Sequence, residues 1–125
     1  MFIIIFVTLK KNLIEQEIEI CFHLAAQVEV GLARKFPYLT WETNIKGTYS
    51  LLEAVRECGD QIKSVIIASS DKAYGEVGKK SYTEDTCLNS IFLYDVSKSC
   101  ADLICQSYAK TYNLKIGILR CANLY

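Results

Sequence analysis

Two short segments of this sequence carry side chains whose types and spacing suit acid and base chemistry. Ser69 to Gly75 (SSDKAYG) combines two hydroxyls, a carboxyl and an amine, enough for a hydrogen-bond donor, a general acid and a general base. Tyr94 and Lys98 (YDVSK) are four residues apart and would therefore share one face of a helix. A phenol has a pKa of about 10, and a nearby ammonium group would stabilise the phenolate and lower that pKa. The structural alternatives are a solvated turn for the first segment and a tyrosine packed on a lysine stem for the second.

These segments must be positioned by the strands and helices around them. Three short apolar runs are predicted to be buried strands, namely residues 18–24 (IEICFHL), 63–69 (KSVIIAS) and 114–119 (LKIGIL). Apolar residues that recur every three or four positions predict two amphipathic helices. One runs from an N-cap at Thr40 to Gly59, and the other runs from about Phe92 to Tyr112 and is ended by Asn113.

The order strand, helix, strand, helix, strand predicts an α/β fold, a partial Rossmann-type doubly wound parallel sheet in one domain, residues 1–125. Two successive crossovers of the same hand place both helices on one face of the strands. A parallel sheet of apolar strands is covered on both faces, so we expect the missing cover to come from further chain. Ligands bind beyond the carboxyl ends of such strands, which selects Ala25 to Gln27, Ser69 to Gly75 and Cys121 to Tyr125.

The composition limits the classes of function. Fourteen Lys and Arg balance 14 Asp and Glu without a run of one sign, which argues against a nucleic acid or a membrane as partner. The six cysteines include no C-x-x-C pair and His23 is the single histidine, so we expect no metal, reduced thiols and a cytoplasmic location. His23, inside a strand, is expected to be a hydrogen-bonded core residue. The apolar run from Met1 to Val7 is too short for a membrane helix and is interpreted as a strand or a misplaced translation start.

Together the motifs closely resemble the extended short-chain dehydrogenase/reductase superfamily, in its NAD-dependent nucleotide-sugar epimerase/dehydratase branch. The resemblance covers about residues 14–125 and rests on five segments in matching order: FHLAAQ (22–27), PxxTxxTNIKGT (37–48), SSDKAYG (69–75), YDVSKSCADLI (94–104) and RCANLY (120–125). The chain thus resembles the central and C-terminal strands of an NAD(P)-binding domain. Asp71 and Lys72 make it most similar to the CDP-glucose 4,6-dehydratases, because the family's 4-epimerases usually lack the acidic residue.

The resemblance implies a lyase, a hydro-lyase that oxidises a nucleotide-sugar at C4 with NAD, eliminates water across C5 and C6 and returns the hydride to C6. Tyr94 would take the proton of the 4-hydroxyl, Lys98 would hold the nicotinamide ribose, and Ser70 would bond the same hydroxyl. Lys72 would remove the C5 proton while Asp71 protonates the departing 6-hydroxyl. As a base, Lys72 must be neutral, which needs a pKa lowered by burial or by neighbouring positive charge.

The other matched residues receive supporting roles from the same resemblance. The residues that would lie against NAD are Leu24, Ala25, Ala26, Gln27 and Ser69, together with Tyr94 and Lys98. Asn44 would support the site from the long helix, and Asn123 would bind the phosphates of the nucleotide-sugar substrate. The resemblance also implies a homodimer for the complete enzyme.

Two features of the family are absent from the sequence. There is no G-x-x-G-x-x-G turn, whose amides hold the cofactor pyrophosphate at a helix N-terminus, and no substrate domain after RCANLY. We therefore expect these 125 residues to be a fragment that is inactive by itself. The alternatives are a nucleotide-sugar 4-epimerase of the same family and a non-catalytic truncated remnant.

Overall fold

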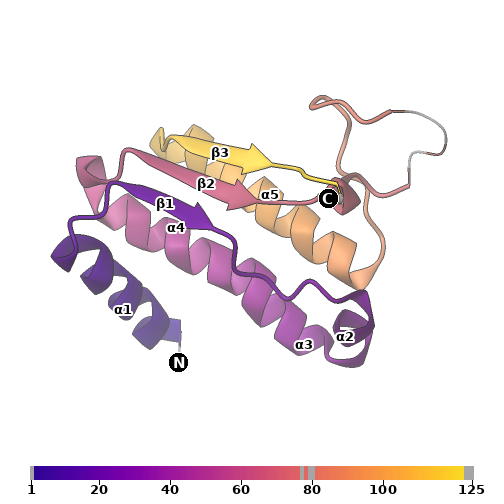
Figure 1. The fold of residues 1–125 in the computed structure, drawn as a ribbon, viewed down its shortest axis with the longest axis horizontal. Coiled ribbons are helices and arrows are strands. Elements are labelled where there is room, and N and C mark those ends of the chain that lie inside the picture. Colours follow the sequence, from indigo (N-terminus) through magenta and orange to yellow (C-terminus); the bar gives the residue numbers. More distant parts are fainter. Residues whose placement is uncertain (1, 77, 79–80, 123–125) are drawn as a thin grey trace.

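The computed structural model describes residues 2–76, 78 and 81–122 as a layer of strands on a layer of helices (Figure 1). In chain order the longer elements are α1 (Phe2–Glu15), β1 (Ile20–His23), α2 (Val30–Lys35), α3 (Pro37–Thr40), a π-helical segment (Trp41–Lys46), α4 (Gly47–Glu57), β2 (Ser64–Ala68), α5 (Leu93–Tyr112) and β3 (Ile116–Leu119). Short 3-10 turns lie at Gly59–Gln61 and Asp71–Tyr74.

The three strands form one parallel sheet in the order β1, β2, β3. Cys21 of β1 pairs with Val65 of β2, which pairs with Ile116 of β3. Long helices connect consecutive strands, because a parallel pair cannot be joined by a tight turn. The predicted α/β class, with its three strands and their order, is confirmed.

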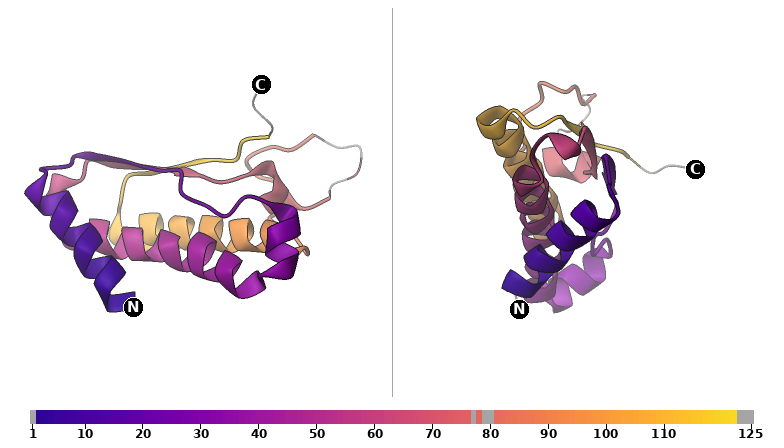
Figure 2. Two further views of the ribbon diagram at one scale, coloured as in Figure 1. Left: turned by 60° about the horizontal axis from the view of Figure 1, so that its bottom comes forward. Right: turned by 90° about the vertical axis from the view of Figure 1, so that its left-hand side faces the viewer.

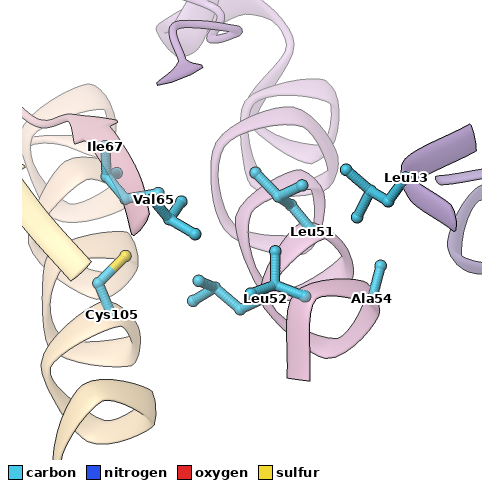
Figure 3. Packing of buried hydrophobic residues seen from close by; sticks show 8 residues of the cluster. Leu13, Leu51, Leu52, Ala54, Val65, Ile67 and Cys105 are labelled. Atoms are coloured by element: carbon cyan, nitrogen blue, oxygen red, sulfur yellow. The ribbon is translucent and has the colours of Figure 1, made fainter. Parts of the chain in front are cut away.

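Both long helices, α4 and α5, lie on the same face of the sheet (Figure 2). Side chains from α1, α4, β2 and α5 meet there in one apolar cluster that includes Leu51, Leu52, Val65 and Cys105 (Figure 3). The other face is open: Phe22 is 68% exposed and Leu119 is 50% exposed. The expectation that one face of the sheet is uncovered is confirmed. The expectation that β1 is a buried strand is wrong for the described residues, because Ile20 and Phe22 are exposed.

The N-terminal segment is a helix, so its interpretation as a strand is wrong. Phe6, Leu9 and Leu13 recur at helical spacing and pack against the apolar cluster. Lys10 adds an ion pair to Glu57 at the end of α4, with 2.7 Å between Nζ and Oε2. The segment α1 therefore lies beside α4 in the helix layer and does not cover the open face of the sheet.

The helix predicted to begin at Thr40 begins earlier. Pro37 is the first residue of α3, where its fixed φ and missing N–H suit a helix start, and Thr40 has helical angles of φ −63° and ψ −44°. The Thr40 hydroxyl makes no cap and instead points back to the Phe36 carbonyl, 3.4 Å away. The predicted ends are confirmed: Gly59 has φ +59° after α4, and Asn113 has φ +55° after α5.

Candidate functional site

A cleft of about 470 Å³ opens at the carboxyl ends of β1 and β2. Among the residues that line it are Leu24, Ala26, Ser69, Ser70, Asp71, Lys72, Tyr94 and Lys98. The structure thus brings together the two segments singled out for acid and base chemistry, and it adds part of the segment after β1. Ala25 does not line this cleft but a smaller pocket that shares Ala26 and Lys98 with it, and Asn123 lies outside the described residues.

The SSDKAYG segment continues β2 and then turns. The Ser69 and Asp71 amides donate to the carbonyls of Leu119 and Cys121 at 2.9 and 3.1 Å, so the sheet pairing extends past both strand ends. The Ser70 hydroxyl accepts the Lys72 amide at 3.2 Å, which caps the 3-10 turn, and donates to Asp71 Oδ1 at 3.1 Å. These bonds fix Ser70 and Asp71 at the cleft, while the side chain of Lys72 is exposed.

Tyr94 enters the cleft from the first turn of α5 and is 9% exposed. Burial raises the pKa of Tyr94 because it disfavours the charged phenolate; a hydrogen bond with Ser70 acts against this, and Asp95 and Asp71 reinforce it. The expected lowering of this pKa by Lys98 is therefore wrong for the described residues. The phenol is therefore neutral at neutral pH.

Lys98 lies one turn after Tyr94 on the same helix and is 7% exposed. Its ammonium donates to the carbonyl of Ala68 at 3.0 Å, and burial lowers its pKa. This bond places the amine at the end of β2, where the segment that carries Ser69 and Ser70 begins. The shared helix face predicted for Tyr94 and Lys98 is confirmed.

Asn44 holds the segment after β1 against α5. Its Oδ1 accepts the Gln27 amide at 2.7 Å, and its Nδ2 donates to the Gln27 carbonyl at 3.0 Å and to Ser97 Oγ at 2.8 Å. Asn44 is 2% exposed and lies in the π-helical segment, a kind of irregularity that is common at functional sites. Asn44 therefore sets the position of the segment from Leu24 to Gln27, as a supporting residue would.

Two residues expected at the cofactor direct their polar groups elsewhere. The Gln27 side chain donates to the Glu29 carbonyl at 2.8 Å, and the Ser69 hydroxyl turns inward to Asp102 Oδ2 at 2.9 Å. His23 makes the hydrogen bond expected from the sequence, but at a half-buried position and not in the core. Its Nε2 lies 3.0 Å from Thr48 Oγ1, and burial followed by the Lys98 charge lowers its pKa. Because the Thr48 hydroxyl already donates to the Asn44 carbonyl, His23 Nε2 is the donor to Thr48.

Sequence reasoning missed one buried charge pair beside the cleft. Asp102 is 0% exposed, and the Arg120 Nε and Nη2 atoms donate to its two oxygens at 2.8 and 3.0 Å. Burial would raise the pKa of Asp102, but the bonds from Arg120, Gln106 and Ser69 hold it below its ordinary value. A signal was present, because Asp102 follows Lys98 by four residues and so shares its helix face.

The cleft suits part of a dinucleotide. Ala26 and Ala68 line it near Lys98, and such small side chains leave room for a planar ring. Along residues 2–76, 78 and 81–122, no glycine-rich turn opens a helix where a pyrophosphate would bind. The same residues include no group of three or more His, Cys, Asp or Glu placed to hold a metal ion, and no helix with the length and apolar content to cross a bilayer.

Comparison with known proteins gives one consistent family. The profile described as GDP-mannose 4,6 dehydratase matches residues 7–125. The CDP-glucose 4,6-dehydratase of Salmonella typhimurium is 35% identical over 108 residues, covering 86% of this chain and 30% of the relative. A dTDP-glucose 4,6-dehydratase of Mycobacterium tuberculosis is 31% identical over 106 residues, covering 82% of this chain and 31% of the relative. The chain thus spans about a third of the length of the curated relatives it matches.

Solved structures resemble the whole fold. A dTDP-glucose 4,6-dehydratase from Streptomyces venezuelae with bound NAD superposes with a TM-score of 0.88 at 30% identity, covering 96% of this chain and 36% of that one. A UDP-glucose 4-epimerase from Thermotoga maritima with UDP-glucose superposes with a TM-score of 0.86 at 32% identity, covering 96% of this chain and 39% of that one. The expectation that the sheet is of the Rossmann-like kind found in dehydratases is confirmed.

Proposed function

Because the chain belongs to the NAD-dependent epimerase/dehydratase family, we propose that its cleft carries the chemistry of a nucleotide-sugar 4,6-dehydratase, with CDP-glucose as the first candidate substrate. The observation that supports this most is the meeting of Ser70, Tyr94 and Lys98 at the carboxyl ends of the strands, with Asp71 and Lys72 at the same cleft. The relatives named above are dehydratases and an epimerase that act on nucleotide-sugars by their names, and one solved dehydratase holds NAD.

In this proposal Tyr94 receives the proton of the sugar 4-hydroxyl. Ser70 lines the same cleft as Tyr94, and its hydroxyl would bond the sugar 4-hydroxyl. Lys98, fixed on the Ala68 carbonyl, retains two further N–H donors with which to bind a ribose diol. NAD would accept hydride from C4, return it to C6 and bring a positive charge next to the cleft.

Asp71 and Lys72 distinguish dehydration from simple oxidation. A ketone at C4 makes the C5 proton acidic, so a base and an acid at the next two positions can complete the elimination. The pKa of Asp95 is raised, mainly by burial. The charge of Lys72 lowers this pKa, and the charge of Asp71 raises it. Lys72 is therefore exposed and lies near the carboxylates of Asp71 and Asp95. The proposal requires the bound nucleotide-sugar to bury the Lys72 amine.

A 4-epimerase is the second candidate. Ser70, Tyr94 and Lys98 suffice for oxidation at C4, and the Thermotoga maritima 4-epimerase superposes nearly as well as the dehydratase. Asp71 and Lys72 favour the first candidate, because epimerisation needs no acid for a departing hydroxyl. A 4-keto-6-deoxy sugar and a 4-epimer are chemically distinct, so the two candidates are separable by product analysis.

The test places this chain in a complete enzyme. A chimaera in which the chain replaces its matching segment in the Salmonella typhimurium CDP-glucose 4,6-dehydratase is incubated with CDP-glucose, dTDP-glucose and UDP-glucose. We expect loss of one water and a 4-keto-6-deoxy sugar from CDP-glucose, seen by mass spectrometry and NMR. A 4-epimer would support the second candidate, and a folded chimaera that converts no substrate while the parent enzyme is active would contradict both.

A further inference from the structure

The 3-10 turn that carries Asp71 and Lys72 is hydrogen-bonded directly to α5. The Ser99 hydroxyl donates to the carbonyl of Ala73, the residue after Lys72, at 2.7 Å. Ser99 is 7% exposed and Ala73 is 0% exposed, so the bond is shielded from water. Among the residues that the structure describes, this is the only hydrogen bond that joins the turn Asp71–Tyr74 directly to a residue of α5.

A second serine, Ser90, reaches the same point from the segment before α5. Its Oγ lies 2.7 Å from the Ser99 Oγ. Because the Ser99 proton is directed to the Ala73 carbonyl, Ser90 is the donor in this pair. The backbone of Gly75, with φ +71°, lies close to the same segment, since a Cβ at position 75 would collide with the Asn89 carbonyl. The end of the turn, the segment before α5 and α5 itself therefore meet around Ser99.

Other hydrogen bonds hold the turn and its approach, but they lead to the sheet. The Asp71 amide and the Tyr74 hydroxyl are bonded to the two residues that follow β3. Lys98 is bonded to the last residue of β2, before the turn begins. The turn is thus held from two sides, by the sheet and by Ser99, and Ser99 is the side that belongs to the helix of Tyr94.

We propose that Ser99 is a positioning residue that sets the place of Asp71 and Lys72 relative to Tyr94. The inference rests on the proposed function for its purpose, since Asp71 and Lys72 would perform the elimination and Tyr94 the oxidation at C4. Ser99 does not line the cleft and acts through the carbonyl of Ala73. Loss of its hydroxyl should therefore loosen the turn and slow elimination, while oxidation keeps its rate.

Amide hydrogen exchange in the purified 125-residue chain tests the positioning without cofactor or sugar. The amides of Ala73 and Gly75 are bonded to the carbonyls of Ser70 and Lys72, and these two bonds close the turn. In Ser99→Ala we expect both amides to exchange about two- to tenfold faster, which is the range for loss of one hydrogen bond. The turn would then open locally more often than in the parent chain.

Ser50→Ala is the matched control. Ser50 is also fully buried, and its hydroxyl donates to a backbone carbonyl, that of Lys46, at 2.6 Å. This bond lies within one long helical stretch and does not involve the turn. Its loss should destabilise the chain by a similar amount and leave the exchange of the Ala73 and Gly75 amides at the parent's rate.

The chimaera with CDP-glucose tests the purpose of the positioning. The NADH band rises as C4 is oxidised and falls as elimination is completed and hydride returns to C6. Ser99→Ala should slow the fall about two- to tenfold and leave the rise unchanged, a split that a general loss of stability does not produce. Ser50→Ala should match the parent in both phases.

Parent-like exchange of the turn amides in Ser99→Ala would overturn the inference, and so would equal acceleration in Ser50→Ala or equal slowing of both NADH phases. If Ser99→Ala fails to fold, Ser99→Cys carries the test, because its thiol keeps the shape of the side chain but is a weak donor. A folded parent chimaera that converts no substrate would refute the proposed function, and the exchange measurement would then decide the positioning by itself.

Discussion

Replacement of Asn44 by alanine should destabilise the chain more than the same replacement at an exposed asparagine. The side chain is 2% exposed and makes three hydrogen bonds, two to the backbone of Gln27 and one to Ser97. Alanine can replace none of them. The variant leaves the Gln27 amide and carbonyl without their partner at a half-buried position.

The magnitude follows from those three bonds. Each of the three bonds is worth about 0.5–1.5 kcal/mol net, and the better helix propensity of alanine returns about half a kcal/mol, so we expect a loss of about 1–4 kcal/mol. That is a large part of the stability of a small domain, which is about 5–15 kcal/mol, yet it leaves the variant folded.

The assay is urea unfolding followed by far-ultraviolet circular dichroism. Asn12→Ala is the control, since it makes the same chemical change on an exposed position of α1, and we expect it to be equal to or slightly more stable than the parent. Amide hydrogen exchange of Gln27 should accelerate in Asn44→Ala alone. A loss below about 1 kcal/mol, or one no larger than in the control, would refute the view that Asn44 holds this segment.

Three further predictions concern pH, mechanism and cofactor. In the folded chain the pKa of His23 is below its ordinary value, so near and below pH 6.5 the unfolded chain binds more protons than the folded one. The free energy of unfolding should therefore fall as the pH drops below about 6.5. His23→Gln keeps a donor for Thr48 and should flatten this pH dependence, as measured by urea unfolding. Lys72→Ala in the chimaera should oxidise CDP-glucose but not dehydrate it, so that NADH and the 4-keto hexose accumulate; normal dehydration would contradict the role of Lys72. The purified chain should show no saturable NAD binding at millimolar concentration, because the pyrophosphate turn is missing, and micromolar affinity in calorimetry would contradict this.

The strands and the last helix were predictable because their signals are local. The runs around β2 and β3 are too apolar to lie in a loop, and the spacing of Tyr94, Ala101 and Tyr108 favours a helix. Two errors came from local ambiguity. The run from Met1 to Val7 has no period of its own, and the helical spacing appears only when Leu9 and Leu13 are included. Thr40 competes as a helix start with Pro37, which has the correct chemistry for the first helical position.

The sequence predicted which segments would form the candidate site, but not how their side chains are oriented or buried. The rule that ligands bind at the carboxyl ends of parallel strands selected the segments Ala25 to Gln27 and Ser69 to Gly75, and the structure places residues of both at one cleft. The direction of the Ser69 hydroxyl depends on Asp102, which is 33 residues away in sequence and in another element. Likewise the raised pKa of Tyr94 depends on how deeply its ring is buried, which no spacing rule contains.

A single-turnover absorbance trace of the chimaera tests the central claim that this cleft oxidises a nucleotide-sugar at C4 through Tyr94. With CDP-glucose, we expect the NADH band to rise and then fall as the dehydrated product forms, because the cofactor is reduced in the first step and regenerated in the last. Tyr94→Phe should show neither phase while keeping the fold, with Tyr112→Phe as the exposed control that behaves like the parent. A rise of the NADH band in Tyr94→Phe at the parent's rate would contradict the account.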